Sequence, residues 1–223
     1  MFSRIVPRYD MLNRILSFGC DHHWRARLAE AARHGPTGRI LDLATGTFDV
    51  ALALCDRYPN ITVPAVDFCL PMMQKGRSKL RGRNRERILP IAGDATCLPL
   101  PDASVDSITI AFGIRNIQAR HTVFAEMLRV LTPGGLACIL EFGSSRERIW
   151  GGIYNLYLNY LLPCLGKLIS GHDGAYAYLV RTVHDFPDAV TLEKELRSAG
   201  FACTRAERIF SGIVCLHVAE KAR

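Results

Sequence analysis

The amino-acid sequence predicts an α/β protein with a doubly wound, mostly parallel sheet whose last strand is antiparallel. Two observations carry this prediction. From residue 39 to residue 199, short apolar segments alternate with segments of helical periodicity, which is typical of parallel strands joined by helices. Near the C-terminus, two strand-like segments are joined only by Ser211-Gly212, and so short a connection requires them to run antiparallel.

Two helical patterns precede the first strand, and Gly35-Pro36-Thr37-Gly38 breaks the chain after them. The β-branched second strand leads to Asp67, and Pro71 suits the first turn of the helix that follows. In this part of the chain we expect helices Tyr9–Leu16, His22–His34, Phe48–Arg57 and Pro71–Leu80, with strands Arg39–Leu43 and Thr62–Val66.

The second half of the chain continues the alternation. Pro133-Gly134-Gly135 is expected to end a helix. Thr191 is expected to cap the start of the last helix, and Gly200 to close its end. Here we expect strands Ile88–Ala92, Val105–Ala111, Leu136–Phe142, Cys203–Phe210 and Ile213–Ala219, with helices Thr122–Leu131, near Ala175–Val183 and Leu192–Ala199.

The composition suits one globular domain over residues 1–223, since 49% of the residues are hydrophobic and 22% are charged. The formal net charge is +7, and its densest cluster lies between Lys75 and Arg87. Such a run is usually a solvated helix face that leads into a loop, and contact with acidic lipid headgroups is the alternative. The eight cysteines include no C-x-x-C pair, so we expect buried thiols in a reducing, cytoplasmic compartment rather than disulfides or zinc.

One segment, Ile149 to Gly166, contains no charged residue and is long enough to span a bilayer. Pro163 and several polar residues within it argue against a continuous spanning helix. We expect it instead to line a binding cleft or to dip into a membrane interface. Residues 1–35 and the insert 149–185 are together expected to form a lid over the substrate cleft.

Three loops that follow predicted strands carry the candidate ligand-binding residues, because ligands of such sheets lie beyond the carboxyl ends of the strands. The first loop, Asp42-Leu43-Ala44-Thr45-Gly46-Thr47-Phe48-Asp49, has small residues that let a ligand approach the backbone. Asp67 follows the second strand and can accept hydrogen bonds from both ribose hydroxyls. Asp94, in Gly93-Asp94-Ala95 after the third strand, can accept one from an adenine amino group. Together the three loops predict a nucleoside site.

The competing ligand at this site is NAD. A dinucleotide site favours G-x-G-x-x-G around its pyrophosphate, whereas the first loop contains Gly46 alone. S-adenosylmethionine (SAM) has no phosphate and is therefore favoured, and no metal is expected.

Strings along nearly the whole chain are shared with one family of enzymes. They include MFSRIVPRYDMLNRILSFG, LDLATGTFD, GDATCLPLPDASVDSITIAFGIRN, MLRVLTPGG and SGIVCLHVAEK. By these strings the chain resembles the ubiquinone/menaquinone biosynthesis C-methyltransferases of the UbiE type, which include demethylmenaquinone methyltransferase. Phe112-Gly113-Ile114-Arg115-Asn116 is the most characteristic match.

The resemblance implies a Rossmann-like class I methyltransferase fold, with seven strands and helices on both faces of the sheet. It also implies that SAM methylates a ring carbon of a demethylated polyprenyl quinol, either a naphthoquinol or a benzoquinol. The family's binding positions fall on Thr47, Asp67, Asp94-Ala95 and Ala111, the last of which is a serine in many relatives. From the loops and the resemblance together, we expect the cofactor to be bound by Asp42, Ala44, Gly46, Thr47, Asp67, Phe68, Asp94, Ala95 and Ala111.

Catalysis requires the ring carbon, the methyl group and the sulfur to lie in line, and it requires the quinol to lose a proton. Arg115 is the candidate to stabilise the resulting quinolate, and Asn116 is the candidate to orient it or a water. The alternative for Arg115 is a structural pair with a carboxylate. Further candidates are Tyr9, Asp10, Tyr154, His184 and Asp185.

Phe48 departs from the family pattern, which has glycine at this position. Its ring either crowds the loop beside the methionine part of SAM or turns into the core as the first helix residue. The first outcome would favour an alternative function, a non-catalytic SAM-fold subunit of a quinone-biosynthesis assembly.

A nucleic-acid methyltransferase is a second alternative, motivated by the net charge of +7, although the chain lacks an N/D-P-P-Y loop. As partners we expect a lipophilic quinol and no nucleic acid, with a peripheral membrane contact and a homodimer left open.

Overall fold

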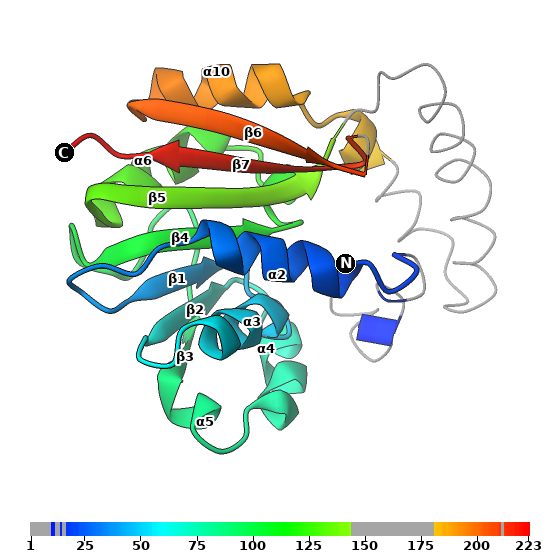
Figure 1. The fold of residues 1–223 in the computed structure, drawn as a ribbon, viewed down its shortest axis with the longest axis vertical. Coiled ribbons are helices and arrows are strands. Elements are labelled where there is room, and N and C mark those ends of the chain that lie inside the picture. Colours follow the sequence, from blue (N-terminus) through cyan, green and yellow to red (C-terminus); the bar gives the residue numbers. More distant parts are fainter. Residues whose placement is uncertain (1–9, 12–13, 15–16, 144–180, 211) are drawn as a thin grey trace.

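A seven-stranded sheet in the order β3-β2-β1-β4-β5-β7-β6 forms the centre of the protein (Figure 1). The computed structural model describes residues 10–11, 14, 17–143, 181–210 and 212–223. Strands β1 to β5 pair in parallel, whereas β7 is antiparallel to both of its neighbours, β5 and β6. The prediction of a mostly parallel sheet with an antiparallel last strand is confirmed.

The helices and strands lie close to their predicted positions. The strands are β1 (Ile40–Leu43), β2 (Val63–Asp67), β3 (Ile88–Ala92), β4 (Val105–Ala111), β5 (Leu131–Phe142), β6 (Cys203–Ile209) and β7 (Val214–Glu220). The helices are α2 (Asp21–Ala31), α3 (Asp49–Arg57), α4 (Leu70–Gly76), α5 (Asn84–Arg87), α6 (Arg120–Val130) and α10 (Ala189–Ala199), with 3-10 turns η3 (Arg77–Lys79) and η4 (Ile114–Asn116).

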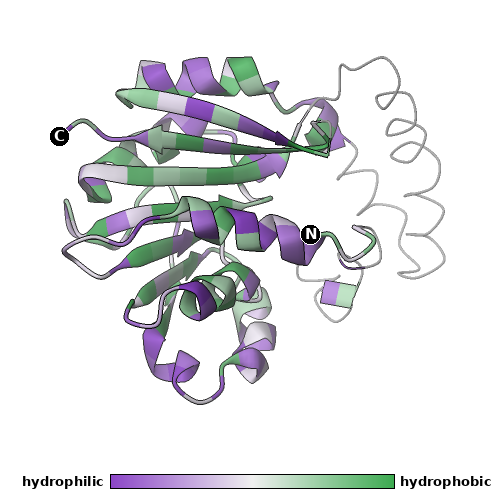
Figure 2. Cartoon of the chain, in the orientation of Figure 1, coloured by the Kyte–Doolittle hydropathy of each residue, from purple (hydrophilic) through white to green (hydrophobic). Residues whose placement is uncertain are grey.

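The sheet is covered on both faces, as the fold class requires. One core cluster joins it to α2 and α3, and a second joins it to α6 and α10. Figure 2 shows the inner strands as mainly hydrophobic ribbons, whereas the edge strand β6 and the helices are of mixed character. This arrangement leaves the carboxyl ends of β1, β2 and β3 side by side at one edge, where a ligand can reach them.

The start of β5 differs from the prediction. Pro133-Gly134-Gly135 does follow the end of α6, but β5 begins at Leu131 and runs through these residues instead of beginning at Leu136. The register with β4 shifts here, so the segment forms a bulge at the beginning of the strand. Gly134 has a φ of 73°, and a Cβ on Gly135 would lie 2.8 Å from the carbonyl oxygen of Thr132, which explains the two glycines.

The predicted cap of α10 is wrong. The helix begins at Ala189, and Asp188 is its N-cap, whose carboxylate accepts the backbone N–H of Thr191. Thr191 therefore takes part in the cap through its main-chain N–H and not through its side chain. Gly200, with a φ of 112°, does close the helix.

Two other predicted helices are shorter than expected. The helix expected over 71–80 ends at Gly76 and continues as the 3-10 turn η3, and the helix expected to reach His34 ends at Ala31.

Several predictions fall outside the described residues. These are most of the helix Tyr9–Leu16, most of the helix near Ala175–Val183, and the uncharged segment Ile149–Gly166. Among the helices that the structure describes, none has the length and apolar character needed to cross a membrane. The seven cysteines within the described ranges are free thiols.

Candidate functional site

Direct hydrogen bonds join the three predicted loops at the carboxyl ends of β1, β2 and β3. Oδ2 of Asp67 accepts the N–H of Gly46 at 2.7 Å, which ties the second loop to the first. The N–H of Gly93 donates to the main-chain carbonyl of Asp67 at 3.1 Å, which ties the third loop to the second. The fold therefore brings together residues that are more than twenty positions apart in the sequence.

The first loop owes its shape to left-handed backbone positions. Ala44, Gly46 and Phe48 have φ values of 54°, 57° and 68°, a region that glycine adopts without steric cost and other residues rarely adopt. The loop is held in this shape because Thr45 donates its N–H to the carbonyl of Val66 in β2. Such a close-turning loop of small residues exposes main chain to a ligand.

Asp42 supports the first loop from within the protein. Its side chain is buried and accepts hydrogen bonds from the hydroxyls of Thr45, at 2.6 Å, and Thr109, at 3.0 Å. Burial raises the pKa of Asp42 to about 7, against the effect of those two hydroxyls. The carboxyl group thus acts on the loop through Thr45 and not as an exposed ligand group.

Phe48 turns into the core beneath the first loop. The side chain is fully buried, and its ring lies so close to Gly76 of α4 that a Cβ there would come within 2.7 Å of the ring. The expectation that the ring turns into the core is therefore correct, but Phe48 is the N-cap of α3 and the first helix residue is Asp49. The ring does not crowd the ligand side of the loop.

Asp67 and Phe68 present complementary groups for a nucleoside. The Asp67 carboxylate also accepts the N–H of Cys69 at 2.6 Å, and burial raises its pKa although these hydrogen bonds oppose the effect. The ring of Phe68 is 82% exposed, which is unusual for so large an apolar side chain and leaves a face for stacking on a base. A carboxylate for the ribose beside an exposed ring for the adenine fits SAM.

The third loop carries Asp94 and Ala95 at the outer edge of the site. The N–H and the hydroxyl of Thr96 both donate to Oδ1 of Asp94, and these hydrogen bonds hold the pKa of this carboxyl below its usual range. Ala95 packs against the core, and Ala111 ends β4 in a half-buried position. The third loop thus offers the charged carboxylate of Asp94. The end of β4 offers no hydroxyl, because residue 111 is an alanine.

Arg115 makes a buried ion pair with Glu141 of β5. Nη1 of Arg115 donates to the two carboxylate oxygens at 2.5 and 3.2 Å, and the two side chains are 9% and 0% exposed. The guanidinium also lies 5.2 Å from the ring centre of Phe142 and 5.9 Å from that of Phe112. Its Nε has no hydrogen-bond partner among the described residues. The carboxylate expected under the alternative interpretation of Arg115 is Glu141.

Glu141 is one residue near this site that the sequence analysis does not predict. A carboxylate inside the apolar stretch Leu136–Phe142 requires a partner when the strand is buried, and that was the signal available. Burial raises the pKa of Glu141 to about 7, although Arg115 opposes this. Asn116, next along η4, approaches the carbonyl of Phe112 with its side-chain nitrogen at 3.5 Å.

The string that contains Arg115 lies directly against the first loop. A Cβ on Gly113 would lie 2.7 Å from the Cβ of Ala44, so only glycine allows the two segments to approach this closely. The contact connects the most characteristic string of the sequence to the first loop.

The further candidate residues are dispersed. Asp10 contacts the first loop through Thr47, whereas His184 and Asp185 are exposed near α10. Tyr9 and Tyr154 lie outside the described residues.

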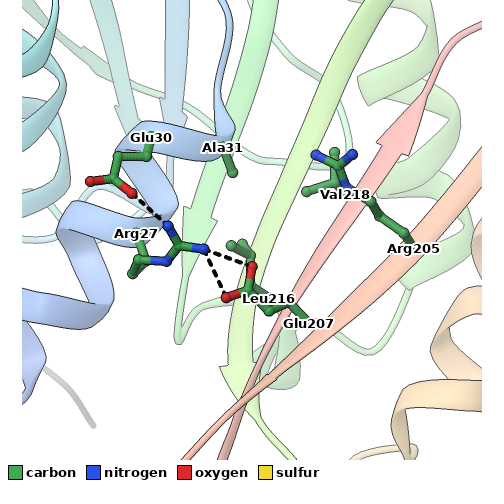
Figure 3. Close-up of a pocket in the computed structure, with 7 residues that line it drawn as sticks. All are labelled: Arg27, Glu30, Ala31, Arg205, Glu207, Leu216 and Val218. Carbon is green, nitrogen blue, oxygen red and sulfur yellow. Dashed lines mark hydrogen bonds and ion pairs between the residues drawn. The ribbon is translucent and has the colours of Figure 1, made fainter.

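A surface hollow between α2 and the β6–β7 edge is separate from this site (Figure 3). Arg27 spans it by donating to Glu30 and Glu207. Its lining residues come from α2, β6 and β7, and none of them belongs to the three loops. We assign it no role in ligand binding.

A model of the ubiE/COQ5 methyltransferase family matches residues 1–221. The chain belongs to this family. Among its relatives, demethylmenaquinone methyltransferase of Thermus thermophilus is 43% identical over 221 residues, which cover 99% of this chain and 100% of the relative. The ubiquinone/menaquinone biosynthesis C-methyltransferase UbiE of Geobacter sulfurreducens is 43% identical over 229 residues, which cover 99% of this chain and 87% of the relative.

Solved structures share the fold of this ubiE/COQ5 family member. A SAM-dependent methyltransferase from Aquifex aeolicus matches with a TM-score of 0.63 at 16% identity, over 88% of each chain. Phosphoethanolamine N-methyltransferase 2 of Haemonchus contortus, in complex with phosphomonomethylethanolamine and S-adenosylhomocysteine, matches with a TM-score of 0.60 at 14% identity, over 83% of this chain and 49% of that one. The class I fold predicted from the resemblance is confirmed, and the chain is a SAM-dependent methyltransferase.

Proposed function

We propose that this enzyme transfers the methyl group of SAM to a ring carbon of a demethylated polyprenyl quinol in quinone biosynthesis. The observation that carries the proposal is the contact of Gly113 with Ala44, because it holds the start of η4, the turn that carries Arg115, against the first loop. The relatives, which are demethylmenaquinone methyltransferase of Thermus thermophilus and UbiE of Geobacter sulfurreducens, supply the substrate class.

One set of residues is proposed to bind the cofactor and another set to bind the acceptor. When bound, SAM supplies a methyl group already activated by the sulfonium. Asp67 would accept hydrogen bonds from the ribose hydroxyls, Asp94 would accept one from the adenine amino group, and Phe68 would cover the base. The main chain of Ala44 and Gly46 would hold the methionine part, and Asp42 keeps that loop in shape through Thr45.

Arg115 stabilises the quinolate that forms when a hydroquinone hydroxyl loses its proton. A guanidinium that is held by a buried carboxylate and two rings is oriented before the substrate arrives, so little reorganisation is needed as charge develops. Asn116 orients the quinolate or a water beside it. The ring carbon would then form its bond to the methyl group as the bond between that methyl and the sulfonium sulfur breaks, so that S-adenosylhomocysteine is the leaving group. The proton of that carbon would pass to water, which restores the aromatic ring.

A lipophilic acceptor needs an apolar cleft and access to a membrane. We propose that residues 1–35 and 149–185 enclose the polyprenyl tail. Exposed arginines near α5 support a peripheral contact with anionic lipids. The non-catalytic alternative rested on Phe48, whose ring lies in the core, and the nucleic-acid alternative rested on net charge alone.

Turnover of labelled SAM with a demethylated naphthoquinol and with a demethylated benzoquinol tests the proposal. Replacing Arg115 alone would leave a buried carboxylate without its partner and would destabilise the fold, so the useful variant is Arg115→Met combined with Glu141→Gln. We expect this double variant to fold and to lose turnover by about a hundredfold, because a group that stabilises developing charge is gone.

The matched control is Arg120→Met with Glu195→Gln, which removes an ion pair of 2.8 Å outside the three loops. The control should turn over as the wild type does. Wild-type turnover in the Arg115–Glu141 double variant would make that pair purely structural. Binding of S-adenosylhomocysteine without turnover of either quinol would support the non-catalytic alternative.

A further inference from the structure

One lysine of the basic run between Lys75 and Arg87 is built into the cofactor loop. Nζ of Lys79 lies 2.6 Å from Oδ1 of Asp49, 2.8 Å from Oδ2 of Asp10 and 2.9 Å from Oγ1 of Thr47. The side chain is 27% exposed, whereas the arginines at 77, 81, 83 and 85 are exposed. For Lys79 the expected solvated helix face is wrong, because the chain turns it back onto the start of α3.

Thr47 holds Lys79 and Asp10 together. Its hydroxyl donates to Oδ1 of Asp10 at 2.7 Å and accepts from Lys79. The one proton of the hydroxyl is therefore used within the protein, and Thr47 as a whole is 2% exposed. Thr47, which we expect to contact the cofactor, thus also supports two charged side chains, each of which keeps more than a quarter of its surface exposed.

The position of this pair along the sheet edge indicates which part of a ligand it would meet. The order β3-β2-β1 places Asp94, Asp67 and the first loop in sequence along that edge. A SAM molecule with its adenine at Asp94 and its ribose at Asp67 has its methionine part at the first loop. That part carries one carboxylate and one ammonium group, and the pair offers one charge of each sign.

We propose that the Asp10–Lys79 ion pair recognises the amino-acid end of the cofactor, with Thr47 and Asp49 holding the two side chains in place. The proposal rests on the SAM-binding part of the proposed function and not on the identity of the acceptor. Arg25 reinforces the arrangement from behind, since it lies 2.6 Å from Asp21 and 3.4 Å from the second oxygen of Asp49.

Two nucleosides test this recognition by calorimetry. S-adenosylhomocysteine carries the amino-acid end, whereas 5′-methylthioadenosine has the same nucleoside and sulfur without it. We expect Lys79→Met to weaken the binding of S-adenosylhomocysteine by about tenfold and that of 5′-methylthioadenosine by less than about twofold, because only the first ligand loses a charge-assisted hydrogen bond. Asp10→Asn should show the same contrast, and Lys79→Arg should restore most of the affinity.

The control is Arg120→Met, because the Arg120–Glu195 pair is exposed to nearly the same extent, 26% and 31%, and lies outside the three loops. It should leave both affinities unchanged. An equal loss for the two ligands in Lys79→Met would mean that the pair only holds the loop in shape, and unchanged affinity for both would remove it from the site. Either result overturns the proposal. Quinol turnover of the wild type is measured separately, so a protein that binds S-adenosylhomocysteine without methylating a quinol would count against the proposed acceptor alone.

Discussion

Phe48 shows how a residue can depart from a family pattern without disturbing the site. Its left-handed backbone, at a φ of 68°, is unfavourable by about 1–2 kcal/mol for a residue with a Cβ. Full burial of the ring against Gly76 contributes about 1.5–3 kcal/mol in the opposite direction. Burial therefore offsets the backbone strain, and the steric argument for an inactive protein disappears.

Glycine usually destabilises a protein more than alanine does at the same position, and we expect the reverse at Phe48. Phe48→Ala is expected to lower the free energy of unfolding by about 3–5 kcal/mol because it leaves a cavity. Phe48→Gly removes the same ring but relieves the left-handed strain, so it should be less destabilising than Phe48→Ala by about 1 kcal/mol. Urea denaturation measures both.

Phe124 is the matched control for this comparison. It is buried in α6 and is not among the residues with positive φ, so Phe124→Gly should be more destabilising than Phe124→Ala by about 1 kcal/mol. The same order at both positions would show that strain at Phe48 does not contribute.

At the scale of the element, α10 shows why predicted helix boundaries shift. The apolar periodicity of its sequence begins at Leu192, which is buried, and indicated a helix from there. The actual start depends on which oxygen satisfies the free N–H groups of the first turn, and the Asp188 carboxylate does so for Thr191. Aspartate and threonine are both good caps, so local sequence alone does not choose between them.

The two candidate caps can be distinguished by single substitutions. Asp188→Ala should lower the free energy of unfolding by about 1 kcal/mol, because a helix N–H loses its acceptor. Thr191→Ala should change it by less than about 0.5 kcal/mol, because this residue is exposed and contributes its main-chain N–H. Thermal and urea unfolding provide the measurement. A greater loss of unfolding free energy for Thr191→Ala than for Asp188→Ala would show that the threonine side chain is the cap.

At the scale of the whole molecule, the net charge of +7 is distributed unevenly. Part of the basic run is structural, since Nε and Nη1 of Arg87 donate to the carbonyls of Ile61 and Cys55, each at 3.1 Å, and Lys79 joins the cofactor loop. The remaining arginines of the run, at 77, 81, 83 and 85, are exposed around η3 and α5. They form the surface that we associate with a lipid interface.

Vesicles that contain anionic lipids test this surface. The wild type should bind them at low salt and release them as the salt concentration rises, because exposed charges are screened. Arg81→Gln with Arg83→Gln should weaken binding by about tenfold. The control Arg205→Gln with Arg208→Gln changes the net charge equally at exposed positions of β6, and equal weakening in both would indicate a general charge effect without a lipid-binding surface.

Much of the fold could be predicted because its signals are local. Alternating apolar segments, Gly200 and the short connection around Ser211-Gly212 each act within a few residues, and the structure has the strands and the antiparallel hairpin where these signals put them. The same holds for the loop from Asp42 to Asp49 and for Asp67, because a residue that ends a parallel strand lies at the ligand edge whatever its neighbours are.

The contacts that individual side chains of the site make became known only from the tertiary structure. Glu141 lies 26 positions from Arg115, and the fold makes it the partner of that guanidinium. Asp10, Thr47 and Lys79 come from three separate segments, so their spacing in the sequence does not predict that they are in contact. Local sequence signals were enough to predict the family, the sheet and the edge at which we propose that SAM binds. The direction in which Phe48, Asp42 and Lys79 point was decided by packing and by the pairing of buried charges, which depend on contacts between distant parts of the chain.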